Sequence, residues 1–156
     1  MIKKMQLKEL RHARQYGIGR LLLLGRRDFE SRLSEKLELS GHKGPSRSSG
    51  ALLPFIDLEG TRSTELARRI GISKQAAAKA VKELEEEGLL TRTEDEADGR
   101  AFLVSFTDRG VEYLLQIHNA IIEIEREYET LVGVAQMNTV RRTLSSIVYA
   151  NQDDEV

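Results

Sequence analysis

Hydrophobic residues recur every three or four positions at both ends of the chain, the spacing that places them on one side of an α-helix. The first such stretch covers residues 6–39, contains no proline and is too long for one compact helix. Two further stretches cover residues 114–131 and 137–147. We therefore expect long helices at both ends, around a middle part with a different pattern.

The middle part begins with a loop, GHKGPSRSSG, at residues 41–50. Its glycines, serines and proline favour turns, so the first helical stretch should end at Gly41 and a new helix should start near Ser46. Pro54 should kink or stop that short helix, because proline lacks an N–H and crowds the preceding turn.

The next segment, residues 61–84, has the pattern of two helices joined by a tight corner. The first helix should begin near Ser63 and pack through Ala67, a small residue that allows close approach. Gly71 suits the corner because it adopts a positive φ without a Cβ penalty, and Ile72 is expected to fill the corner. Ser73 is a typical N-cap for the second helix.

The second helix has two distinct faces. Ala77, Ala80, Val81 and Leu84 form an apolar stripe, while the opposite side carries Gln75, Lys79, Lys82 and Glu86. Residues 89–93 and 100–106 then read as two strands of a hairpin, and Thr107 should cap another helix. This order predicts a fold that is mainly α with a small β-hairpin wing, a winged helix-turn-helix with a helical dimerisation region.

The stretches TELARRIGISKQAAAKAVKELEEEGLLTR and DGRAFLVSFTDRG resemble the core of the MarR-type transcription regulators. The resemblance implies a homodimer on a pseudo-palindromic operator in double-stranded DNA. It places the recognition helix, residues 74–87, in the major groove and the wing, residues 91–106, at the minor groove. It also implies that a small effector, commonly aromatic or anionic, relieves the regulation by weakening DNA binding.

Carried onto this chain, the resemblance names the residues expected at the DNA. Gln75 and Lys79 would reach base edges, where Gln suits adenine and Lys suits guanine. Asp98 would orient Arg100 in the wing, and the small Ala76 and Ala78 would let the helix backbone approach the groove floor. The expected DNA-binding set is Ser73, Lys74, Gln75, Ala78, Lys79, Lys82, Arg92, Asp98 and Arg100.

The C-terminal stretch supports a dimer. Its apolar residues have the spacing of a coiled-coil seam that includes Ile121 and Ile124. Packing of this seam against the N-terminal helix of the same chain is the alternative. We expect three regions: dimerisation helix and loop (1–45), winged helix-turn-helix (46–109) and C-terminal dimerisation helices (110–156).

The charge is unevenly distributed, although the net charge is only −1. Residues 1–50 carry 12 Lys and Arg against 5 Asp and Glu, residues 61–109 carry 9 against 10, and residues 110–156 carry 3 against 8. The neutral middle and the acidic wing tip leave a second class open, a winged-helix module that binds a protein partner and not DNA.

Composition excludes several other classes. The chain has no cysteine, so thiolate metal sites and disulfides are excluded, and its longest apolar run is too short to span a membrane. The three histidines lack metal-ligand spacing, and no nucleotide-binding or catalytic motif occurs. We therefore expect a cytoplasmic protein that is not an enzyme and has no metal or cofactor.

Overall fold

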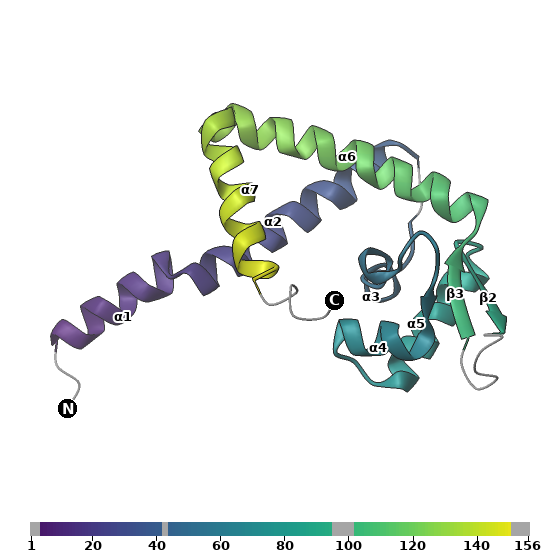
Figure 1. The fold of residues 1–156 in the computed structure, drawn as a ribbon. Helices are drawn as coiled ribbons and strands as arrows, with labels where there is room; N and C mark the ends of the chain where they lie inside the picture. Colours follow the sequence, from purple (N-terminus) through teal and green to yellow (C-terminus); the bar gives the residue numbers. More distant parts are fainter. Residues whose placement is uncertain (1–3, 42–43, 95–101, 151–156) are drawn as a thin grey trace. The chain divides into compact units, whose positions relative to one another are not determined.

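The computed structural model describes residues 4–41, 44–94 and 102–150. Helices dominate, and one small antiparallel sheet lies in the middle of the chain (Figure 1), which confirms the predicted fold class. The helices are α1 (Lys4–Tyr16), α2 (Ile18–Leu39), α3 (Arg47–Gly50), the 3-10 helix η1 (Leu53–Phe55), α4 (Ser63–Ile70), α5 (Lys74–Glu86), α6 (Asp108–Val132) and α7 (Val134–Val148). The strands are β1 (Thr61–Arg62), β2 (Leu90–Glu94) and β3 (Phe102–Phe106).

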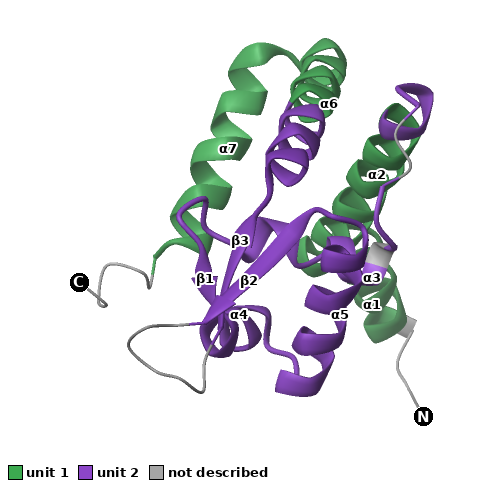
Figure 2. Cartoon of the chain, turned by 90° about the vertical axis from the view of Figure 1, so that its right-hand side faces the viewer, with its two compact units in different colours: residues 1–36, 119–156 green, residues 37–118 purple. Residues whose placement is uncertain are grey.

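The chain forms two compact units, shown in different colours in Figure 2. Residues 37–118 form one, which we call the winged unit because it contains the sheet and α4 and α5. Residues 1–36 and 119–156 form the other, which we call the helical unit. Both ends of the chain therefore contribute to one unit, and α2 and α6 each run from one unit into the other.

The winged unit has a continuous apolar core. Leu66 of α4, Leu84 of α5 and Val104 of β3 are completely buried. The sheet has the strand order β1–β3–β2, and its hairpin register places Leu90 opposite Phe106. Two α6 residues of the predicted C-terminal seam, Leu114 and Ile117, pack against this core, so this part of the seam is covered by the chain itself.

Strand β1 has only two residues and was not expected from the sequence. Thr61 pairs with Val104 of β3 and is buried. Its hydroxyl accepts a hydrogen bond from the Asp57 backbone N–H at 2.8 Å. This bond satisfies a buried polar group and closes the turn that leads from η1 into β1.

The corner between α4 and α5 follows the expectation closely. Gly71 ends α4 with a φ of 72°, and the Ser73 hydroxyl caps α5 by accepting the Ala76 N–H at 3.1 Å. Ala67 is buried where the two helices meet. The role expected of Ile72 is wrong, because its side chain is 37% exposed and does not fill the corner.

The segment before this corner also matches its sequence signals. Ser46 caps α3 and accepts the Ser49 N–H at 3.2 Å. Pro54 lies inside the short η1, so the chain does not continue as an α-helix through this position. Leu52 and Leu53, which immediately precede Pro54, are buried in the core.

A tight joint connects the end of α5 to the start of α6. The Thr107 hydroxyl donates to the Gly88 carbonyl at 2.6 Å and accepts the Gly110 N–H at 3.0 Å, which confirms Thr107 as a cap. A Cβ on Gly110 would clash with the Leu89 carbonyl oxygen. Glycine at position 110 is therefore required by the closeness of the two backbones.

In the helical unit, α2 and α6 are joined by charged side chains. Arg32 and Lys36 of α2 each approach Glu127 of α6 to 2.7 Å. The Tyr128 hydroxyl donates to Asp28 at 2.8 Å, and the pKa of this carboxyl is lowered by the hydrogen bonds from Arg32 and Tyr128. Ile124, a residue of the predicted seam on the same side of α6, is completely buried.

Gly133, with a φ of 93°, lies between α6 and α7 and is the N-cap of α7. Arg141 of α7 reaches back to Glu125 and Glu129 of α6 at 3.0 and 3.1 Å. No residue of α7 is buried. Among the described residues, no helix is long and apolar enough to cross a membrane.

Candidate nucleic-acid interface

Helix α5 presents one polar face outside the core of the winged unit. Its apolar stripe is buried as predicted. Between its first turn and its third, the opposite side exposes Lys74, Gln75, Ala78, Lys79 and Lys82. Apart from an ion pair of 3.6 Å between Lys82 and Glu86, these cations have no acidic partner among the described residues.

The first turn of α5 is suited to a phosphate group. Ser73 caps the helix, and the backbone N–H groups there carry the positive end of the helix dipole. No acidic residue occupies this turn, and Lys74 is exposed beside it. Ala76 and Ala78 are exposed as well, so no large side chain keeps a partner away from the backbone.

Arg92, the wing arginine expected at DNA, is paired with an acidic side chain of the same unit. Arg92 of β2 forms an ion pair with Glu85 of α5 at 2.8 Å, and its guanidinium lies 5.6 Å from the centre of the Phe102 ring. The contact ties the wing to the helix that precedes it. Two other expected residues, Asp98 and Arg100, lie outside the described residues.

A cluster of charged residues around α4 was not expected from the sequence. Arg69 donates to Asp57 at 2.9 Å, to the Phe55 carbonyl at 3.2 Å and to Glu65 at 3.0 Å. Glu65 also accepts two bonds of 2.8 Å from Arg68. Hydrogen bonds from Arg68 and Arg69 lower the pKa of Glu65 to about 2. The spacing of Glu65, Arg68 and Arg69 along one helix was the available signal.

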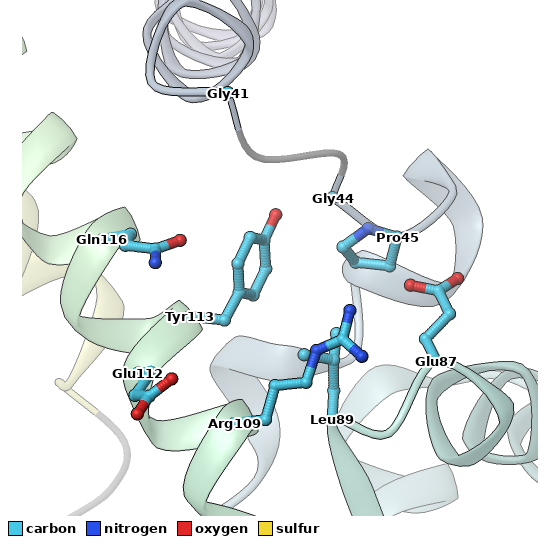
Figure 3. Close-up of a pocket in the computed structure, with 9 residues that line it drawn as sticks. All are labelled: Gly41, Gly44, Pro45, Glu87, Leu89, Arg109, Glu112, Tyr113 and Gln116. Carbon is cyan, nitrogen blue, oxygen red and sulfur yellow. The ribbon is translucent and has the colours of Figure 1, made fainter.

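The winged unit also contains a pocket of about 290 Å³ beside the joint between α5 and α6. Figure 3 shows Tyr113 and Arg109 reaching from α6 toward the side formed by Pro45 and Glu87. The Gln116 Oε1 atom is buried and has no hydrogen-bond partner among the described residues. Burial, followed by the charge of Glu87, raises the pKa of Tyr113. The lining residues are Gly41, Gly44, Pro45, Glu87, Leu89, Arg109, Glu112, Tyr113 and Gln116.

Similarity in sequence to known proteins covers part of the chain. A sequence model of the MarR family matches residues 43–101. The transcriptional regulator AdcR of Streptococcus pneumoniae is 37% identical over 57 residues, 36% of this chain and 39% of that protein. A riboflavin kinase of Cenarchaeum symbiosum is 44% identical over 52 residues, 33% of this chain and 25% of that protein. The chain thus spans well under half of either relative.

Solved structures match over a greater length. A MarR transcriptional regulator from Methanosarcina mazei has a TM-score of 0.71 at 21% identity, covering 89% of this chain and 98% of that one. The PcaV transcriptional regulator from Streptomyces coelicolor, solved with its natural ligand, has a TM-score of 0.67 at 17% identity. It covers 88% of this chain and 95% of its own. The shared fold therefore includes both the winged and the helical unit.

Proposed function

Because this chain is a MarR-type winged-helix protein, we propose that it is a homodimeric transcription regulator that binds a specific operator in double-stranded DNA. The observation that carries the proposal is the exposed face of α5, which is cationic and not covered by other described residues. Such a regulator acts where the chromosome lies, in the cytoplasm. The Cenarchaeum kinase matches only a third of the chain, so it gives no reason to propose an enzyme.

The proposed roles within α5 follow from side-chain chemistry. Gln75 and Lys79 lie one helical turn apart and would read base edges in the major groove, adenine by Gln75 and guanine by Lys79. Ser73, Lys74 and Lys82 would hold the backbone phosphates. Ala78 would leave room for the helix to approach the floor of the groove.

The wing would lie at the minor groove, with Arg100 oriented by Asp98. Arg92 is held by Glu85, so we propose that it reaches a phosphate only by exchanging this carboxylate. The acidic Glu94 follows Arg92 by two residues in the exposed end of β2. The wing is therefore proposed to contribute less attraction to DNA than α5 does.

Unburied apolar side chains of the helical unit support the homodimer. Residues 18–24 of α2 include Ile18 and four consecutive leucines, all exposed. A helix that is apolar on every side is stable in water only when other helices cover it. In α7, Val140 and Ile147 belong to one apolar stripe and are also exposed. We propose that a second copy covers both surfaces, and its two-fold symmetry would require a pseudo-palindromic operator.

The pocket beside α6 is the proposed site of an effector. It adjoins the end of α5 and the start of α6, so a molecule bound there would contact both sides of their joint. Arg109 could bind the anionic group of a small aromatic ligand, and the Gln116 Oε1 atom lacks the donor that such a ligand could supply. The ligand-bound PcaV structure has the same overall fold.

A salt titration separates DNA binding from binding of a protein partner. Phosphate contacts release counterions, so DNA affinity should fall steeply as the salt concentration rises. The measurement uses mixed genomic fragments from the host and the intact protein, and selection of the bound fragments would then identify the operator. If no fragment binds at low salt, the winged unit serves a protein partner and the proposal fails.

A further inference from the structure

The segment that contains the helix-turn-helix and the wing has no net positive charge. Residues 61–109 carry 9 basic against 10 acidic side chains. Arg69 is held by Asp57 and Glu65, and Arg92 is held by Glu85. Phosphate neutralisation supplies most of the non-specific affinity for DNA. Cations from another part of the chain would therefore add to the attraction that the exposed lysines of α5 provide.

Helix α1 carries such cations. Lys8, Arg11 and Arg14 follow one another at intervals of three residues, which places them within about 120° on one side of the helix. All three are exposed, and none has an acidic partner among the described residues. Figure 1 shows α1 continuing beyond α2, away from α6 and α7.

Three acids of α6 in the same unit are already engaged. Glu127 binds Arg32 and Lys36, and both Glu125 and Glu129 bind Arg141. These carboxylates therefore pair with other cations and not with those of α1. What remains on α1 is an exposed positive side that suits an anionic partner from outside the chain.

We propose that α1 is a second DNA-contacting element, whose Lys8, Arg11 and Arg14 bind backbone phosphates without reading sequence. This inference rests on the proposed function and extends it to a part of the chain outside the winged unit. From Lys8 to Arg14 the helix rises about 9 Å. A duplex carries about five phosphate charges over that length of its axis, so each cation can find a partner.

A membrane surface is the other anionic partner that a basic helix can bind. Membrane helices of this kind bury a wide apolar face opposite their cations. In α1, Leu7 and Leu10 lie beside Arg14 on the wheel. The side opposite Arg11 carries Met5, Ala13 and Tyr16, but the charged Glu9 lies among them and interrupts the apolar face. The distribution of side chains on α1 therefore favours phosphates of a nucleic acid.

The test compares two charge-neutralised variants of the intact protein, R11Q/R14Q and the matched control R126Q/R142Q. All four arginines are exposed, belong to the helical unit and are replaced by a residue of high helix propensity. Binding to a fluorescein-labelled duplex of arbitrary sequence is measured by anisotropy over a range of KCl concentrations. The salt slope of R11Q/R14Q should fall by about two units for each engaged copy of α1, since one phosphate contact contributes about 0.9. The control should keep the wild-type slope.

The possible results separate the inference from the proposed function. If R11Q/R14Q keeps the wild-type slope while K74Q/K79Q loses affinity, α1 does not contact DNA and the winged unit does. If the wild-type protein binds no duplex, both proposals fail together. Phosphatidylserine vesicles provide a second comparison. If the vesicles retain the wild-type protein but not R11Q/R14Q, and both proteins have the same salt slope for DNA, α1 is a membrane-binding element and the inference fails. A lower molecular mass of R11Q/R14Q in light scattering would place α1 in the pairing of copies and overturn the inference.

Discussion

Arg92 of the wing and Glu85 of α5 form an ion pair with a nitrogen-to-oxygen distance of 2.8 Å. The pair neutralises a wing arginine that the sequence alone would assign to DNA. It also places a carboxylate beside the face of α5 that we propose to enter the major groove. Both effects would weaken the attraction of this face to DNA, and both depend on one contact.

We expect Glu85→Gln to tighten non-specific DNA binding and to steepen its salt dependence. The change removes a negative charge and releases Arg92, so one additional phosphate contact should raise the slope by about 0.9. The measurement is anisotropy in KCl, with Glu59→Gln as a control that removes an exposed carboxylate outside α5. Equal slopes for wild type and Glu85→Gln would show that Arg92 stays away from phosphate after release.

Replacing Gln75 or Lys79 by Ala should weaken operator binding by about 1–3 kcal/mol each. Both side chains are exposed on α5 and neither contributes to the core, so the fold should be unaffected. Binding to a non-specific duplex should change less, because base edges discriminate only on the true operator. Equal losses on both duplexes would assign the two residues to phosphate. Lys82→Ala provides the comparison for a phosphate contact.

Leu22→Lys and Ile147→Lys should yield folded monomers. Leu22 is 47% exposed and Ile147 is 61% exposed in a single copy, so a lysine there is solvated when the copies separate. Ile124→Lys should instead unfold the helical unit, because a buried unpaired charge costs about 3–5 kcal/mol. Light scattering gives the mass and circular dichroism gives the helix content. A dimeric mass for both exposed-site variants would remove these surfaces from the interface.

Two glycine substitutions should differ in severity. Gly71→Ala should cost about 1–2 kcal/mol, because φ is 72° but the space for a Cβ is open. Gly110→Ala should cost more, since its Cβ would clash with the Leu89 carbonyl oxygen and force α6 away from the end of α5. Urea unfolding of both variants tests the order. If Gly110→Ala lowers the free energy of unfolding less than Gly71→Ala does, the backbone at the joint near Thr107 can shift at little cost.

Acid should weaken α4 through Glu65. The folded-state pKa of about 2 lies below the ordinary value of 4.5, so this carboxylate adds stability above pH 4.5 that is lost as the pH falls toward 2. The melting temperature of wild type should therefore exceed that of Glu65→Gln at pH 6, and the difference should shrink between pH 4.5 and 3. A constant difference across this range would assign the loss in Glu65→Gln to something other than ionisation.

The sequence predicts best those features that depend on neighbouring residues. Gly71, Ser73 and Thr107 occupy their expected corner and caps because each role depends on a few backbone groups close in the chain. The buried stripe of α5 follows in the same way from helical spacing. For this reason most of the winged fold could be predicted without a structure.

Features that join distant residues could not be predicted in this way. Arg69 meets Asp57 and Arg92 meets Glu85 only after the chain folds, and many other exposed acids were equally available. The spacing of the C-terminal seam was recognised, but spacing does not identify the surface that covers it. Leu114 and Ile117 pack on the winged core, whereas Ile124 is buried in the helical unit.

The alanines of α5 also bear on how binding preference could change over time. Ala77 and Ala80 are buried, so larger side chains there would disturb the core. Ala76 and Ala78 are exposed on the same helix, where a longer polar residue can be added without removing any existing packing. A single substitution at either position could exchange the close approach that alanine allows for a new side-chain contact, so a descendant protein could change its target sequence while keeping its stability.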